Sequence, residues 1–322
     1  MAHRVTPPRR QLGMSLVELL VSMAIGLILM VAVLSAYVGS SGAARMAEAQ
    51  SRMNEDAQAA LNILAQQLRM AGDNPIQPNY DTATPRNPAF SATSFSIRGC
   101  EGNNFSNVTS ASSIAALTCT AGGTGADSIA VAYEADVYNT VKNGVNPTDC
   151  LGQTLPTTTV ANSVKVWNTT TLVSTTTTVS FHLADNRFYV GTGGAITVPS
   201  LYCRGNGGTA AQPLVENIED MQITYGTSPT TTTTLYVGGY LSAAEILSNT
   251  DLAALPDDAT RWSKVVTARI CVVARSEQPV VADSVSARYF QCDGTLNTSP
   301  PDLRLRRAYT TTVVLRNRVP AS

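Results

Sequence analysis

The stretch "RRQLGMSLVELLVSMAIGLILMVAVLSAYVG", residues 9 to 39, decides the fold because its residues 14 to 38 are apolar almost without interruption. As an α-helix these 25 residues are about 37 Å long, enough to cross the hydrocarbon core of a membrane. One residue does not fit. Glu18 lies five residues into the run, and a carboxylate in a membrane helix costs roughly 2.5–3.5 kcal/mol. Any interpretation of the segment has to explain this glutamate.

Two ordinary interpretations leave Glu18 without a role. A secretory signal peptide has an apolar core of about 7–15 residues, so this run is too long, although Ser41-Gly42-Ala43 has the small side chains of a cleavage site. Arg9-Arg10 suggests a twin-arginine signal, but little else in the sequence supports one. A simple signal-anchor helix has the right length. Neither kind of segment needs the carboxylate.

The segment Gly13-Met14-Ser15-Leu16-Val17-Glu18 resembles the processing site of type IV prepilins. In that family a prepilin peptidase cuts after the glycine, the new amino terminus is N-methylated, and a glutamate occupies the fifth mature position. The resemblance implies that residues 1–13 are a leader peptide, that Gly13 and Met14 form the cleavage and methylation site, and that Glu18 is the fifth mature residue. Met14 stands where phenylalanine is commoner. The basic leader residues would hold this flank in the cytoplasm: His3, Arg4, Arg9 and Arg10.

Cleavage would give Glu18 a partner in a neighbouring subunit. An α-amino group has an ordinary pKa of about 7.7–8.0, so a new amine at Met14 would be cationic near neutral pH. When such helices pack side by side in a filament, the carboxylate of one subunit can meet the ammonium group of the next, which removes the penalty that either buried charge has alone. A carboxylate that merely reaches the lipid headgroups is the alternative. We expect Glu18 to form an assembly salt bridge.

A helical pattern continues beyond residues 39–42, where two glycines allow a bend. Gly72-Asp73-Asn74-Pro75 ends it, because glycine favours a C-cap and proline cannot continue a helix. The sequence thus predicts one helix from Ser15 to about Ala71, with residues 14–38 in the membrane or filament core and residues 39–72 amphipathic. We expect its second half to pack on a sheet, with a free-standing coiled coil as the alternative. Its apolar residues recur at spacings of three and four: Met53, Ala57, Ala60, Leu61, Leu64, Leu68 and Ala71.

Residues 73–322 alternate short apolar runs with turn-forming residues, which predicts a β-rich globular domain. The fold class is therefore α+β, a type IV pilin-like fold with a long N-terminal helix packed on that domain. The segment "RWSKVVTARICVVARS", residues 261–276, alternates with period two and predicts one core face, made of Val266, Ala268, Ile270, Val272 and Ala274. Further strands are predicted at residues 94–98, 127–133, 163–167, 179–183, 187–190, 221–225, 235–237 and 303–317. Threonine runs at 157–159, 169–171, 175–178, 230–234 and 310–312 are expected to be exposed strands or loops, with glycan attachment as a minor alternative.

All six cysteines lie beyond the apolar segment, and none forms a CxxC pair: Cys100, Cys119, Cys150, Cys203, Cys271 and Cys292. An even number in an exported domain favours three disulfides, for which 15 connectivities exist. We prefer the pairing of sequence neighbours, which joins 100 to 119, 150 to 203 and 271 to 292. Buried free thiols are the alternative.

Three further segments look like blocks of the PilW family, the J-like minor pilins: residues 213–226, 261–276 and 302–318. This resemblance implies a minor pilin that helps to start a type IV pilus and lies at or near its tip. The partners it implies are other minor pilins, the major pilin, a PilY-type tip adhesin, the prepilin peptidase and the inner-membrane assembly platform. It also implies insertion in the inner membrane of a Gram-negative bacterium, with the β-rich domain in the periplasm. The alternatives are a J-type minor pseudopilin of type II secretion and, from another class, a membrane-anchored adhesin or DNA receptor.

Charge argues against a nucleic-acid-binding protein. Removing the three arginines of residues 1–13 takes the formal net charge from −1 to −4. A basic segment near the C-terminus nevertheless resembles a phosphate-binding patch, with Arg304, Arg306, Arg307, Arg316 and Arg318. We expect these arginines to pair with carboxylates such as Glu216, Glu219 and Asp220, or to lie on an exposed strand face.

Nothing in the sequence supports catalysis or a metal site. His182 is the single imidazole that would remain in the mature chain, which excludes a histidine-rich metal site, and its place in a predicted strand favours a structural role over a Ser-His-Asp arrangement. The chain has no GxSxG, HExxH or GxxxxGK[ST] motif. Asp251, Asp257 and Asp258 lack the spacing of a calcium-binding EF-hand loop. We therefore expect no enzymatic activity, cofactor or metal.

Overall fold

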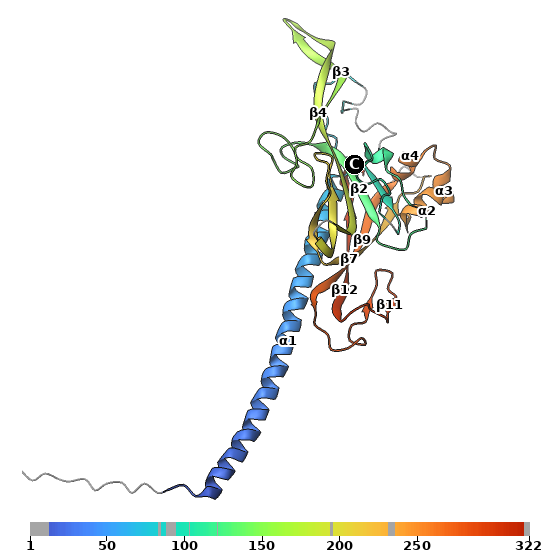
Figure 1. The fold of residues 1–322 in the computed structure, drawn as a ribbon. Helices are drawn as coiled ribbons and strands as arrows, with labels where there is room; N and C mark the ends of the chain where they lie inside the picture. Colours follow the sequence, from blue (N-terminus) through green and yellow to red (C-terminus); the bar gives the residue numbers. More distant parts are fainter. Residues whose placement is uncertain are drawn as a thin grey trace, which may run out of the picture. The chain divides into compact units, whose positions relative to one another are not determined.

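The computed structural model describes residues 13–82, 85–87, 95–102, 104–120, 122–193, 196–230 and 236–318 (Figure 1). Residues 1–12 of the predicted leader lie outside the described residues, as do Ser94 and Leu235 at the start of two predicted strands and most of the threonine run at 230–234. The chain divides into two compact units, Met1–Glu48 and Ala49–Ser322. We call them the N-terminal unit and the globular unit.

A single helix, α1 (Leu16–Met70), continues without interruption through Gly39 and Gly42. It begins where Ser15 accepts a hydrogen bond on its Oγ from the backbone N–H of Glu18 at 3.2 Å, the usual geometry of an N-cap serine. It ends before Gly72, which has a φ of 74°, the left-handed conformation that closes many helices. The helix therefore has the start and the stop that the sequence predicts.

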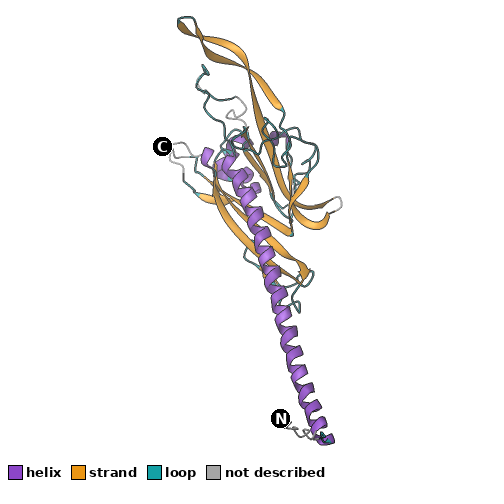
Figure 2. Cartoon of the chain, turned by 90° about the vertical axis from the view of Figure 1, so that its left-hand side faces the viewer, coloured by secondary structure: helices purple, strands orange, loops and turns teal. Residues whose placement is uncertain are grey.

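The apolar stripe on the second half of α1 is buried in the globular unit, as predicted. Its buried residues are Met53, Ala57, Ala60, Leu64, Ala65 and Leu68. They belong to one core cluster with strand residues of both sheets, and Figure 2 shows this half of the helix lying along the strands. The helix also has polar contacts with both sheets, since Asn186 Nδ2 donates to Gln67 Oε1 at 2.8 Å and Tyr309 bonds to Asn54. This packing excludes the free-standing coiled coil.

The larger sheet is antiparallel and has the order β1-β2-β4-β5-β6, with β3 paired to one end of β4. Its strands are β1 (Ile97–Cys100), β2 (Ser128–Ala135), β3 (Thr157–Asn168), β4 (Thr171–Gly193), β5 (Ile196–Arg204) and β6 (Gln212–Glu216). The two strands predicted at 179–183 and 187–190 are one strand of 23 residues, β4. Asp185 and Asn186 suggest a turn by composition, but their side chains bond to Arg187 and Gln67 and so fit inside the sheet.

The second sheet has the order β12-β9-β7-β8. Its strands are β7 (Ile218–Thr227), β8 (Gly239–Leu241), β9 (Val265–Pro279) and β12 (Arg304–Val314). A small β10–β11 pair and five short helices complete the globular unit: β10 (Tyr289–Phe290), β11 (Leu296–Asn297), η2 (Ile114–Ala116), α2 (Ala243–Ser248), α3 (Thr250–Ala253), α4 (Asp258–Trp262) and η3 (Arg316–Arg318). The strand predicted at 235–237 is wrong at Tyr236 and Val237, which precede β8.

Strand β9 differs from its prediction at its start and in its burial. It begins at Val265 because Asp257 caps α4 by accepting a hydrogen bond from the Thr260 N–H, so that residues 258–262 are helical. The predicted core face is buried, but so are most residues of the other face. Cys271 on that second face is bonded to Cys292, which attaches the β10–β11 segment to the strand.

The structure contains three disulfides, each between cysteines that are neighbours in sequence. The Cα–Cα distances are 5.4 Å for Cys100–Cys119, 6.5 Å for Cys150–Cys203 and 5.8 Å for Cys271–Cys292. All three lie in the globular unit. The first two involve strands β1 and β5 of the larger sheet, and the third involves β9 of the second sheet.

Candidate functional site

The first half of α1 has an apolar surface that no described residue of the N-terminal unit covers. Its large side chains are exposed from Leu16, at 77%, to Val38, at 66%. An 18-residue window of the helix has a mean hydropathy of 2.7, and none of it is buried within the protein. By length and composition the helix can cross a membrane. An apolar surface of this extent requires lipid or other helices to cover it.

The three residues that the sequence singles out for processing and assembly lie together at the start of this surface. Gly13 and Met14 precede the first turn of α1, and both are exposed. Glu18 is in the first turn, where a carboxylate is favoured by the helix dipole. It forms no ion pair with any described residue. Its carboxylate is therefore accessible to a cation from outside the chain.

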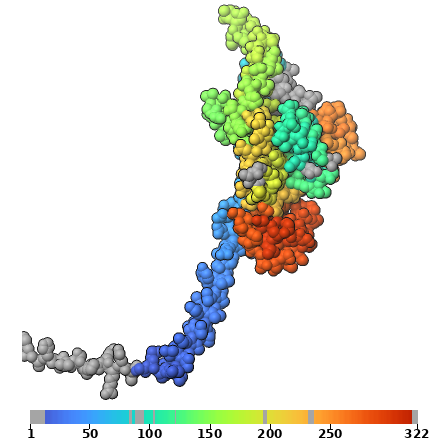
Figure 3. All heavy atoms as spheres, in the orientation of Figure 1, coloured from blue at the N-terminus to red at the C-terminus, as the bar shows by residue number. Residues whose placement is uncertain are grey.

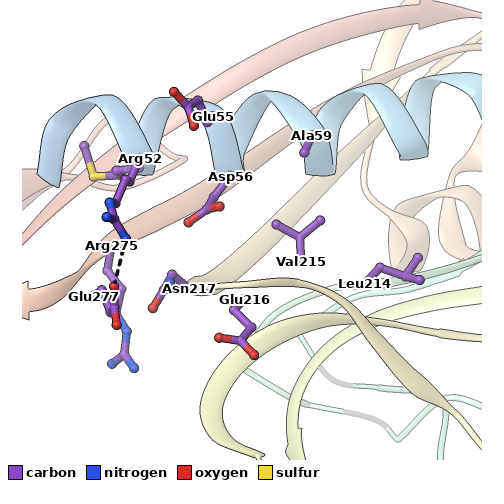
Figure 4. Close-up of a pocket in the computed structure, with 11 residues that line it drawn as sticks. Arg52, Glu55, Asp56, Ala59, Leu214, Val215, Glu216, Asn217, Arg275 and Glu277 are labelled. Atoms are coloured by element: carbon purple, nitrogen blue, oxygen red, sulfur yellow. Dashed lines mark ion pairs between the residues drawn. The ribbon is translucent and has the colours of Figure 1, made fainter. Parts of the chain in front are cut away.

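The globular unit has a groove of about 730 Å³ beside the second half of α1 (Figure 4). Its walls are residues 52–59 of the helix, residues 214–217 of β6 and the following turn, and two side chains of β9. Arg52 and Glu277 form an ion pair of 3.7 Å across it, but both side chains are more than 60% exposed. Such an exposed pair contributes little stability.

Acidic groups outnumber basic ones in this groove. Burial raises the pKa of Asp56, and the charges of Glu55 and Glu216 raise it further, although a hydrogen bond with Asn217 acts in the opposite direction. Asn217 can approach Asp56 (Figure 4) because it has a φ of 62° between β6 and β7. Arg275 is directed to Glu219, at 3.1 Å. The groove is therefore suited to contact a cationic group of a partner.

Two arginines of the predicted basic segment, Arg304 and Arg306, form ion pairs with carboxylates. The Arg306 side chain is fully buried. It donates two hydrogen bonds to Glu219, at 2.5 and 2.9 Å, and one to Asp302 at 2.7 Å. Burial alone would raise the pKa of Asp302, but hydrogen bonds from Arg306 and Arg304 hold that pKa well below its usual range. Of the four arginines of this segment whose side chains the structure describes, Arg304 and Arg306 pair with carboxylates, whereas Arg307 and Arg316 are exposed. Both outcomes that we expected from the sequence, pairing and exposure, therefore occur, and Glu219 is the expected carboxylate that takes part in the pairing.

His182, Asp257 and Asp258 occupy structural positions. The Nδ1 atom of His182, in β4, lies 3.2 Å from the backbone oxygen of Pro156. Asp257 caps α4, and Asp258 pairs with Arg261 at 3.3 Å. Within the described ranges, no three His, Cys, Asp or Glu side chains come together in a way that could hold a metal ion.

Asp127 is a buried residue whose role the sequence did not indicate. Its two carboxylate oxygens accept hydrogen bonds from the backbone N–H groups of Gly102 and Ile223, each at 2.7 Å. Burial raises the pKa of Asp127 to about 6, although these two hydrogen bonds act to lower it. It joins three segments that are far apart in sequence, so a pattern read along the chain carries no signal for it.

Comparisons with known proteins matched two segments of the chain to family models. A family model described as "Type IV Pilus-assembly protein W", PilW, matches residues 187–317, and one described as "Prokaryotic N-terminal methylation motif" matches residues 8–34. A search of curated proteins found no match. Among solved structures, a type IV-like pilin from Thermus thermophilus is similar, with 12% sequence identity, a TM-score of 0.31, and coverage of 85% of this chain and 98% of that one.

The two family matches cover the two ends of the chain. The methylation motif includes Gly13, Met14 and Glu18, and the PilW match extends from the second half of β4 into η3. A long apolar N-terminal helix followed by a β-rich domain is the architecture that these motifs imply. Over residues 187–317 the chain is similar to the PilW family of type IV pilus-assembly proteins, and over residues 8–34 it carries the N-terminal methylation motif.

Proposed function

We propose that this chain is a minor pilin that takes part in starting type IV pilus assembly and lies at or near the pilus tip. The observation that carries the proposal is Glu18, a carboxylate in the first turn of a helix that is otherwise apolar and uncovered. The exposed position of Gly13 and Met14 before that turn supports cleavage after the glycine and methylation of the new amino terminus.

The mechanism is structural. Before assembly, residues 14–38 lie in the inner membrane with the globular unit in the periplasm. After cleavage, the ammonium group of one subunit pairs with the Glu18 carboxylate of another, and the apolar side chains exchange lipid contacts for contacts with neighbouring helices. The globular unit then offers lateral surfaces, among them the acidic groove, to other minor pilins, the major pilin and a PilY-type tip adhesin. The assembly platform of the inner membrane would add the later subunits.

Mass spectrometry of the amino terminus of the mature chain tests the first step. The expected terminus is N-methylated Met14. An intact initiator methionine, or a terminus near residue 44, would remove the cation on which the mechanism depends.

Substitution of Glu18 tests the second step. Glu18→Gln and Glu18→Ala should each reduce the amount of the chain in sheared filaments by about tenfold or more. Both substitutions leave the ammonium group of the neighbouring subunit buried without its carboxylate, which costs well over the roughly 1.4 kcal/mol that a factor of ten represents. Cleavage and membrane levels should not change. Glu48→Gln, at an exposed position of the same helix and outside the acidic groove, is the matched control and should enter filaments normally. Filament incorporation of the Glu18 variants at the control level would refute the assembly role.

Deletion of the gene separates the proposal from the other class of function. Loss of surface pili is expected for a protein that starts their assembly. A membrane-anchored adhesin or DNA receptor would leave the number of pili unchanged.

A further inference from the structure

The most unusual feature of the globular unit is a two-stranded ribbon formed by β3 and one end of β4, residues 157–181, which we call the β3–β4 ribbon. Its strands pair from Thr157 opposite His182 to Asn168 opposite Thr171. Figures 1 and 3 show it, in yellow-green, extending beyond the other strands. Residues 171–178 of β4 are all exposed. A two-stranded ribbon without a covering layer is only marginally stable in water.

One edge of this ribbon has no partner among the described residues. Strand β2 pairs with β4 only from His182 onward, so residues 171–181 of β4 have β3 on one side and no described strand on the other. The outer edge of β3 is partly covered, since Asp81 N–H donates to Ser163 O at 2.8 Å and Lys165 N–H donates to Asn79 O at 2.6 Å. The free edge of β4 therefore presents unpaired main-chain donors and acceptors over eleven residues.

This edge lacks the devices that usually prevent a strand edge from binding another strand. Such devices are charged side chains, prolines, short length and burial. The sequence of residues 171–181, "TLVSTTTTVSF", contains no charge and no proline. Every other edge strand of the two described sheets has at least one device: β1 has four residues that are mostly buried, β3 contains Lys165, β6 contains Pro213, β8 has three residues, and β12 contains three arginines.

The end of the ribbon also exposes apolar side chains in register. Val166 lies opposite Val173, and Trp167 lies opposite Leu172. Their exposed fractions are 46%, 38%, 73% and 50%. Because successive residues of a strand point to opposite faces, the Val166–Val173 pair lies on one face of the ribbon and the Trp167–Leu172 pair on the other. We call these four residues, which expose apolar surface on both faces of the ribbon end, the tip cluster. An exposed tryptophan in such a cluster is the side chain that most often anchors a protein interface.

The tip cluster decides between a second copy of the chain and a different protein. If two copies paired through their β4 edges, Val166 and Trp167 would stay exposed, because they are on β3, the strand away from that edge. A different protein can pair with the edge and cover the tip cluster at the same time. Residues 171–181 offer no opposite charge to a charged side chain of an arriving strand, so an uncharged strand fits this edge best.

We propose that the β4 edge between Thr171 and Phe181 is a docking site for an extended, uncharged strand of another protein, whose apolar surface also covers Trp167. Main-chain hydrogen bonds would provide the affinity of such strand addition, and the fit around Trp167 its specificity. This interaction goes beyond the proposed function, because strand addition to the ribbon does not require that the chain enter a filament.

Photocrosslinking in cells tests the proposal with the full-length chain. A benzoylphenylalanine at position 167 should crosslink to one other polypeptide, identified by mass spectrometry of the crosslinked peptide. The double substitution Thr175→Lys and Thr177→Lys, which puts charge on the β4 strand, should lower the crosslinking yield by about tenfold. The double substitution Thr157→Lys and Thr159→Lys places the same two charges at exposed positions of β3 and is the matched control, expected to leave the yield within about twofold. Both variants must retain three disulfides, as shown by mass before and after reduction.

Hydrogen exchange of the purified, unsubstituted complex in detergent tests strand pairing itself. Addition of a strand bonds every second amide of β4 between residues 172 and 180, so alternate amides should exchange about tenfold more slowly than in the free chain. Alternating protection together with a crosslink to another polypeptide supports the proposal. It is overturned by a crosslink to a second copy of this chain, by no crosslink, by a yield that the lysines on β4 do not change, or by protection that does not alternate.

Discussion

Replacement of Arg306 by methionine is expected to destabilise the globular unit more than any other arginine substitution in β12. Arg306 has a fully buried side chain and charge-assisted hydrogen bonds to Glu219 and Asp302. Methionine is of similar length and can fill the space, so the substitution removes the charge and its hydrogen bonds rather than the packing. Arg307, its neighbour on the exposed side of the same strand, provides the matched control.

The size of the effect depends on which arginine partners Glu219 and Asp302 keep after Arg306 is replaced. Removing one partner of a buried ion pair costs about 3–5 kcal/mol. Glu219 would keep Arg275 at 3.1 Å, and Asp302 would keep Arg304 at 2.7 Å. Both carboxylates are also partly exposed, at 20% and 28%. We therefore expect the lower end of the range, a loss of about 3 kcal/mol in the free energy of unfolding, against less than about 0.5 kcal/mol for Arg307→Met.

Intrinsic fluorescence measures this difference. The chain has two tryptophans, of which Trp262 is 1% exposed and packs edge-on against Tyr225. In a Trp167→Phe background, Trp262 alone reports unfolding of the globular unit. At about 2 °C per kcal/mol for a domain of this size, Arg306→Met should lower the melting temperature by about 6 °C and Arg307→Met by about 1 °C. Equal melting temperatures for the two variants would refute the interpretation of Arg306 as a structural residue.

Three further substitutions are expected to change stability in ways that the same fluorescence measurement detects. Leu64 lies on the buried face of α1, so Leu64→Ala should cost about 3 kcal/mol because it leaves a cavity. Leu61 is half-buried on the same helix, and Leu61→Ala should cost less than half of that. Asp127 has a pKa raised to about 6, so the folded state binds more protons than the unfolded state between about pH 4 and 6. This residue should therefore add stability as the pH falls from 7 to 4, by up to about 3 kcal/mol, and Asp127→Asn should lose that gain; an unchanged pH dependence would contradict this. Joint replacement of Cys271 and Cys292 by serine opens a loop with a sequence separation of 21 and should cost about 3 kcal/mol, whereas a loss below about 1 kcal/mol would show that the loop stays closed without its disulfide.

The parts of the fold that sequence predicts well depend on neighbours along the chain. The limits of α1 follow from Ser15 at its start and Gly72 at its end, and the buried stripe of Met53 to Leu68 follows from helical spacing alone. The long apolar run needs no tertiary information either, because its length and hydropathy are properties of consecutive residues. The same holds for the exposure of the threonine runs in the β3–β4 ribbon.

The features that sequence could not predict depend on contacts between distant segments. Composition marks Asp185 and Asn186 as turn residues, yet Gln67, more than a hundred positions earlier, and Arg187 satisfy them within β4. On the second face of β9, Cys271 is bonded to Cys292, and Arg269 lies over the ring of Tyr240. The acidic groove likewise brings residues of α1, β6 and β9 together. Each of these depends on which elements become neighbours, and a single sequence contains no direct signal for that.

The local structure of α1 does not require a carboxylate at position 18. Its backbone N–H is satisfied by Ser15 at 3.2 Å, and a capping box accepts glutamine as well as glutamate at this position. The helix dipole favours an exposed carboxylate here by about 0.3–1 kcal/mol, which is less than the roughly 2.5–3.5 kcal/mol that a charge in a membrane helix costs. In the mechanism that we propose, the amino terminus of a neighbouring subunit makes up the difference. Because Glu18→Gln keeps the cap and removes only the charge, it distinguishes a local role of this residue from an intermolecular one.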